Sequence, residues 1–107
     1  MDKTKDAAKI PKIVNKYRGD KSLRDFASDL TKDLPGESIT HQSIKYWIDG
    51  TFYPNRYFLV RLILKCRDWR MDFASEILAA LYPDIYGETI EKLPVLERMK
   101  LSRKVTK

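Results

Sequence analysis

The chain is poor in the residues from which disulfides, zinc sites and many active sites are built. Its 107 residues include one cysteine, Cys66, and one histidine, His41. A single cysteine excludes an intrachain disulfide framework and favours an intracellular protein. The cysteine and the histidine lie far apart in sequence, and neither zinc-ligand spacing nor a glycine-rich phosphate-binding loop is present. We therefore expect no enzymatic activity and no cofactor.

Long apolar runs are also missing. The most apolar stretch, residues 57–64, is interrupted by Arg61. No stretch reaches the roughly 18 apolar residues that indicate a membrane span. The first six residues lack the apolar core of a signal peptide. We expect a cytoplasmic protein, prokaryotic or viral in a host cell, with no membrane partner.

Positive charge is in excess. Lysine and arginine number 21 against 15 aspartates and glutamates, which gives a formal net charge of +6. Such a balance favours DNA, RNA or an acidic surface as partner, although a merely soluble basic protein would show it too. The pairs Asp25/Asp29 and Asp72/Glu76 have i, i+4 spacing that could hold a metal, but exposed acidic faces are far commoner. We expect no metal site and no small-molecule substrate.

Helical spacing of apolar residues dominates, and few stretches alternate as a half-buried strand would. The length suggests one domain, and the pattern predicts an all-α fold. Five helices are expected, over about residues 7–17, from 22 to the break at 35–36, 41–49, 56–67, and from 68 to the proline at 83. The fourth should be the most buried, because its apolar face is wide. A weaker pattern allows another short helix over about residues 95–103.

Residues 39–54 are the most informative stretch. Thr40 can cap a helix, Gly50 can adopt the left-handed conformation that ends one, and Pro54 prevents its continuation. Three apolar residues at i, i+3 and i+4 form one inward face: Ile44, Trp47 and Ile48. The rest of the circumference is polar. Without the cap, glycine and proline in register, that polar face would indicate only the solvated side of an amphipathic helix.

A Trp-x-x-Gly-x-x-x-Pro pattern ends this stretch, and residues 23–27 lie in the preceding helix. Together with the apolar segment 58–66 and the Asp68-Trp69 helix start, they resemble the phage-repressor and Cro-like helix-turn-helix family, also called XRE-type. The resemblance covers about residues 9–82. It implies a compact five-helix, lambda-repressor-like bundle, with residues 1–86 as the DNA-binding domain and 87–107 as a basic extension.

Two features depart from the family pattern. Family members usually join the two helices of the motif by a turn of about three to four residues. Here residues 31–38 lengthen that turn and include Pro35-Gly36. Either the second helix is longer or the connection is a real loop, and the angle between the helices stays open. In addition, Ile48 stands where the family often has glutamate, which suggests extra burial.

The resemblance implies that helix 41–49 lies in the major groove of DNA with its N-terminal residues nearest the bases. The residues that it assigns to base recognition are His41, Gln42, Ser43, Lys45 and Tyr46. The Gln42 amide can pair with adenine N6 and N7, a contact worth about 1–3 kcal/mol of discrimination. Lys45 could reach guanine or a phosphate. His41 could do the same or be simply an exposed first-turn residue.

Flanking groups are expected to bind phosphates, which orients the protein without distinguishing bases. These residues are Lys21, Ser22, Arg24, Thr51, Tyr53, Asn55 and Arg56. Phe52 and Tyr53 could pack on sugar or merely cover the core, and covering the core is somewhat favoured for Phe52. Trp47, Trp69 and Cys66 are expected in the core.

The sequence therefore predicts a sequence-specific regulator that binds double-stranded DNA, a repressor acting as a homodimer on two half-sites about one helical turn apart. The alternative is a protein-interaction adaptor or antitoxin-like subunit that uses Phe52, Tyr53 and Tyr57. The tail could add nonspecific DNA affinity, be a solvated end, or form a dimer contact through Leu96 and Met99. Its basic residues are Arg98, Lys100, Arg103, Lys104 and Lys107.

Overall fold

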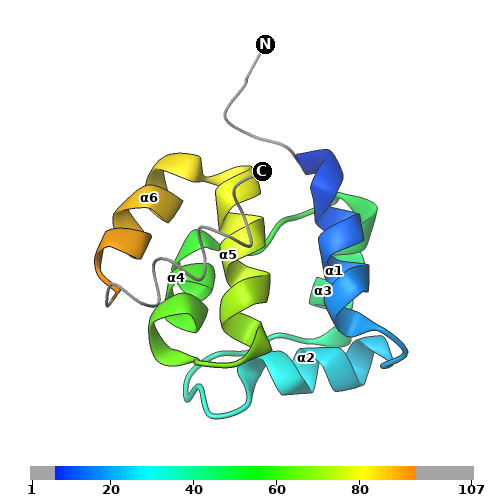
Figure 1. Ribbon diagram of the computed structural model, residues 1–107. Coiled ribbons are helices and arrows are strands. Elements are labelled where there is room, and N and C mark those ends of the chain that lie inside the picture. The colour runs from blue at the N-terminus through cyan, green and yellow to red at the C-terminus, as the bar shows by residue number, and fades with distance from the viewer. Residues whose placement is uncertain (1–6, 94–107) are drawn as a thin grey trace.

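A computed structural model of the chain describes residues 7–93 (Figure 1). After a short 3-10 turn, η1 (Ala7–Lys9), these residues form six α-helices. The helices are α1 (Ile10–Arg18), α2 (Leu23–Thr31), α3 (His41–Asp49), α4 (Arg56–Lys65), α5 (Trp69–Leu81) and α6 (Pro83–Glu91). No strand occurs between residues 7 and 93, and the all-α prediction is confirmed. Within the same range, no helix is long and apolar enough to cross a membrane.

Helix α5 lies at the centre of the fold. Figure 1 shows α4 and α6 on one side of it, α1 and α3 on the other, and α2 across one end. Helix α5 packs on α1, α4 and α6, while α3 packs on α1 and α2. Aromatic rings with centroids 5.6–6.4 Å apart join α1, α2 and α5: Tyr17, Phe26, Trp69 and Phe73. Of these, Phe26 and Phe73 are fully buried, whereas Trp69 is only partly buried.

The most buried helix is α5, so the prediction for the fourth helix was wrong. Helix α5 buries nine residues and α4 buries four. The difference arises because α5 is surrounded by neighbours on several sides, whereas part of α4 faces water. Small side chains such as Ala74 and Ser75 let the neighbouring helices approach it, and both are fully buried.

Helix α6 was not predicted from the sequence. The preceding helix ends before Pro83 as predicted, since α5 stops at Leu81, but Pro83 also opens α6. A proline is compatible with the first turn of a helix, because the amide hydrogen that it lacks would have no partner there. Helix α6 continues through residue 86, so the domain boundary predicted there falls inside a helix. The segment 95–103 and the rest of the basic tail lie outside the described residues.

Side-chain caps set the starts of α2 and α3, and the cap of α3 is the one predicted at Thr40. The Ser22 hydroxyl accepts a hydrogen bond from the Asp25 amide at 3.0 Å, and the Thr40 hydroxyl accepts one from the Ser43 amide at 3.4 Å. At the other end of α3, Gly50 has a φ of 80°, in the left-handed region. The bounds of the predicted recognition helix are therefore fixed by local chemistry.

Trp47 packs α3 against the core. Its side chain is 3% exposed, and its ring centroid lies 6.4 Å from that of Phe58 in α4. We predict that Trp47→Ala lowers the free energy of unfolding by about 3–5 kcal/mol, because the truncation leaves a cavity in the core. Urea denaturation followed by circular dichroism measures the loss.

The control is Tyr57→Ala. Tyr57 is 66% exposed, and surface truncations usually change stability by no more than about 0.5 kcal/mol. If Trp47→Ala were as stable as the control, the burial of Trp47 would not be what holds α3 in place.

Candidate nucleic-acid interface

Helix α3 has one buried side and one exposed side. Ile44 is fully buried with Trp47, while Ile48 is only partly buried. On the opposite side, His41, Gln42 and Lys45 are exposed. Their side chains stand on the first half of a helix whose other side is fixed against the core.

Ser43 and Tyr46, also predicted to contact bases, are less accessible than these three. Both are partly buried. The Ser43 hydroxyl lies 3.5 Å from the Thr40 hydroxyl, so it belongs to the helix cap. The Tyr46 ring meets the Phe52 ring edge to face, with centroids 5.2 Å apart. Phe52 is 62% exposed, so the expectation that it covers the core was wrong.

Of the predicted phosphate contacts at the start of α2, Arg24 is exposed, whereas two others already have partners. The Lys21 ammonium pairs with Asp29 at 2.6 Å and lies 5.1 Å from the centre of the Trp69 ring. The Ser22 hydroxyl oxygen serves as the cap of α2. In this arrangement Arg24 is the accessible cation of the group.

The loop from α3 to α4 supplies the remaining predicted phosphate contacts. Thr51, Asn55 and Arg56 are exposed, and Tyr53 is 39% exposed. The Asn55 side chain accepts a hydrogen bond from the Tyr57 amide at 2.7 Å and so caps α4. The Arg56 guanidinium donates to the Tyr57 hydroxyl at 3.3 Å, and this bond raises the pKa of the guanidinium. Like any arginine at physiological pH, Arg56 carries a positive charge, and it does so at the start of α4.

A shallow depression separates α2 from the N-terminal end of α3. It is lined by Arg24, Ala27, Ser28, Thr31, Glu37, Ser38, Ile39, Thr40 and His41. Ser28 and Thr31 were not among the predicted site residues. Their spacing of four and seven residues from Arg24 places them on the same side of α2, and that spacing could have identified them.

The connection between the two helices is a real loop rather than an extension of α2. Helix α2 ends at Thr31 and α3 begins at His41, and Leu34 is buried although it lies outside the helix. The Arg61 guanidinium of α4 pairs with the Glu37 carboxylate at 2.5 Å and donates to the Pro35 carbonyl at 3.5 Å. The lengthened turn is therefore held against the helices behind it.

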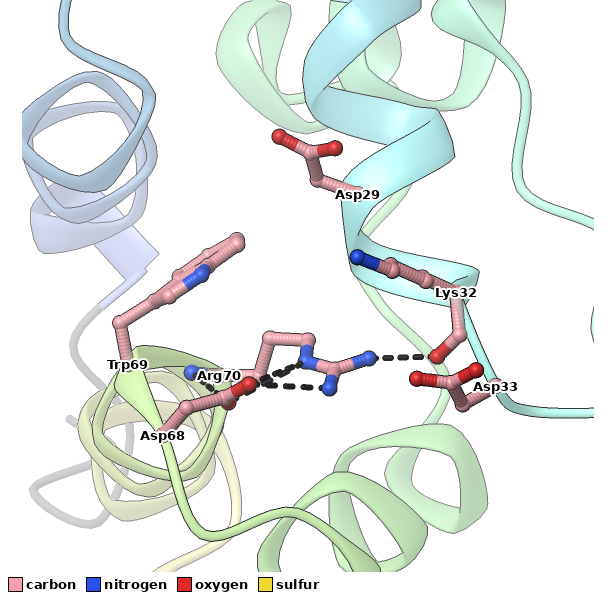
Figure 2. Close-up of a pocket in the computed structure, with 6 residues that line it drawn as sticks. All are labelled: Asp29, Lys32, Asp33, Asp68, Trp69 and Arg70. Carbon is pink, nitrogen blue, oxygen red and sulfur yellow. Dashed lines mark hydrogen bonds and ion pairs between the residues drawn. The ribbon is translucent and has the colours of Figure 1, made fainter.

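Arg70 of α5 holds the other end of this loop. Its guanidinium donates to the Lys32 carbonyl at 2.5 Å and to both Asp68 carboxylate oxygens at 2.9–3.2 Å (Figure 2). The side chain is 10% exposed, so these bonds satisfy a largely buried charge. The bond from Arg70 holds the pKa of Asp68 below its ordinary value. Arg61 and Arg70 together tie residues 32–37 to α4 and α5.

Glu76 of α5, one member of the pair Asp72/Glu76, has structural partners. Glu76 accepts hydrogen bonds from Lys16 and Tyr17. Between residues 7 and 93, no group of three or more histidine, cysteine or acidic side chains is placed to hold a metal. Cys66 is buried, and burial raises the pKa of its thiol.

Comparison of the chain with protein-family models, with curated proteins and with solved structures found no match. The case for a function therefore depends on the geometry around α3.

We predict that Arg70→Ala lowers the free energy of unfolding by about 1–3 kcal/mol, because the Lys32 carbonyl and the Asp68 carboxylate lose their donor. Amide hydrogen exchange should also accelerate in residues 33–38. Urea denaturation and exchange mass spectrometry provide the two measurements.

The matched control is Arg67→Ala, since Arg67 is exposed and donates only to carbonyls of residues 63–66. Asp68 has a lowered pKa in the folded protein. Its pairing with Arg70 therefore stabilises the fold above the ordinary pKa of about 3.9. This stabilisation is lost as the pH falls through the lowered pKa. The difference in free energy of unfolding between wild type and Arg70→Ala should therefore decrease below about pH 4. Unchanged exchange in residues 33–38 would contradict the role of Arg70.

Proposed function

We propose that the protein is a sequence-specific regulator that binds double-stranded DNA, acts as a repressor and places α3 in the major groove. One observation carries the proposal. Helix α3 presents Gln42, Lys45 and His41 to solvent while Ile44 and Trp47 bury its other side.

This arrangement suits recognition of base edges. The major groove admits an α-helix, and helix-turn-helix proteins contact bases with the N-terminal residues of their second motif helix. Gln42 is the second residue of α3, and its exposed amide can pair with adenine N6 and N7. Because α3 is already fixed against α1 and α2, binding would cost little ordering of the backbone.

Cations flank α3 at both ends. Arg24 lines the depression beside its N-terminal end, and Arg56 follows the loop at its C-terminal end. Contacts of these two side chains with phosphates would orient α3 without distinguishing sequences. Two protomers would then bind two half-sites about one helical turn apart.

An interaction module is the second candidate, favoured by the exposure of Phe52, Tyr53 and Tyr57. Salt dependence separates the two functions. DNA binding should weaken with salt, with a log–log slope of about −0.9 for each neutralised phosphate. An adaptor or antitoxin-like complex held by apolar contacts should show little change.

We predict that Gln42→Ala loses about 1–3 kcal/mol of discrimination at one base position, because one bidentate contact disappears. Bound sites are first selected from random DNA at physiological salt. Every single-base change in the selected site is then assayed with wild type and variant.

The matched control is Asn15→Ala, which removes an exposed amide from α1. It should leave the base preferences unchanged. An equal loss of affinity by Gln42→Ala on all sequences would argue against base recognition by this residue.

We predict that Arg56→Ala weakens binding to all sequences alike and makes the salt slope shallower by about 0.9, because one phosphate contact is lost. Titrations at several salt concentrations measure this slope. Lys92→Ala is the control of equal charge change, since Lys92 is exposed at the end of α6. A changed sequence preference would show that Arg56 contacts bases instead.

A further inference from the structure

The most exposed large aromatic side chains in the described part of the protein lie within six residues of one another in the sequence. Phe52 and Tyr57 are 62% and 66% exposed, and Tyr53 is 39% exposed. No other large hydrophobic side chain between residues 7 and 93 is comparably exposed. We call these three residues the aromatic patch. It occupies the loop after α3 and the first turn of α4.

The aromatic patch is continuous with α3. The Phe52 ring packs edge to face on Tyr46, which stands one helical turn after Gln42. The Tyr53 hydroxyl lies 3.6 Å from the position that a Cβ on Gly50 would occupy, so this ring lies against the end of α3. A molecule that contacts the exposed side of α3 near Tyr46 would therefore meet Phe52 next.

The patch is held in shape by its backbone. The Thr51 amide donates to the Tyr46 carbonyl at 3.0 Å, Pro54 is buried, and Asn55 caps α4. The rings are thus presented on an ordered loop, and binding would cost little conformational entropy.

Charge favours a polyanion as the occupant. Residues 50–60 contain no aspartate or glutamate, and the Arg56 guanidinium lies 5.1 Å from the centre of the Tyr57 ring. The tyrosine hydroxyls and this cation suit a surface that alternates apolar sugar with phosphate. If a second protomer covered the patch, its Arg56 would approach the Arg56 of the first protomer. This repulsion between like charges is unfavourable.

We propose that Phe52 and Tyr57 make apolar contacts with the deoxyribose and thymine methyl groups that border the bases facing α3. The inference rests on the proposed function and adds a second component to it. One part of the affinity comes from phosphate contacts and depends on salt. Another part comes from the aromatic patch and does not, because burial of apolar surface releases no counterions.

The test measures the dissociation constant on a selected DNA site over a range of salt concentrations for wild type, Phe52→Ala, Tyr57→Ala and Arg56→Ala. The two aromatic variants should each raise Kd about tenfold. Their plots of log Kd against log salt should run parallel to that of wild type. Arg56→Ala should instead change the slope by about 0.9.

Phe52→Leu keeps most of the apolar surface and should recover most of the lost affinity. If Phe52→Ala fails to fold, Tyr57→Ala still provides the test, because that side chain is largely in water. Wild-type Kd values for both alanine variants would overturn the proposal. So would a change in oligomeric state at unchanged DNA affinity per protomer, since a second copy would then cover the patch. If wild type binds no DNA in a salt-dependent way, the proposed function itself fails, and the contact fails with it.

Discussion

The burial of Trp47 and Ile44 against the core is the constraint on which the proposed interface depends. These two side chains decide which side of α3 faces water, and that choice determines whether Gln42 and Lys45 can reach a ligand. A helix of this length would be marginal alone in water, because helix nucleation is unfavourable. The orientation of its polar side is therefore a property of the core beneath it.

The position of α3 relative to α2 also depends on the loop that joins them. A long connection usually leaves the angle between two helices free, but here two arginines from the other half of the fold hold it. Arg70 binds the Lys32 carbonyl near the start of the loop, and Arg61 binds Glu37 nearer its end. Because α4 and α5 pack on each other, both anchors come from one packed pair of helices. Tertiary contacts therefore hold the long connection between α2 and α3 in place.

The sequence predicted those features of the fold that are caused by residues close together in the chain. The caps at Ser22 and Thr40 and the left-handed Gly50 were predictable, because each acts within a few residues. The end of α5 before Pro83 was predicted, but the start of α6 at that residue was missed, because it depends on the packing of α6 on α4 and α5. Periodicity also placed Leu34 in α2, although burial requires only an inward side chain and not a helix.

In the candidate site, too, features set by local spacing were predictable, whereas contacts between distant residues were not. The inward pair Ile44 and Trp47 followed from helical spacing, and so did the exposure of Gln42 on the opposite side. The contact of Lys21 with Trp69 could not be foreseen, because Trp69 lies far away in sequence and meets it only after α2 packs near α5. For Phe52, covering the core was favoured over packing on sugar. A hydrophobic side chain reaches the core only if the backbone directs it there, and the turn that follows Gly50 directs Phe52 toward Tyr46.

The net charge of the protein alone cannot explain how one DNA sequence would be preferred, and the aromatic patch adds a contact that does not depend on charge. A net charge of +6 attracts any polyanion, and attraction of that kind does not distinguish one DNA sequence from another. Within the proposed complex, Arg24 and Arg56 would supply this general attraction, Gln42 the discrimination, and the exposed rings an apolar contact between them. An exposed phenylalanine beside an ordinary solvated helix would have no such use. The contact between Phe52 and Tyr46 joins the two surfaces, and it is the reason to treat them as one interface.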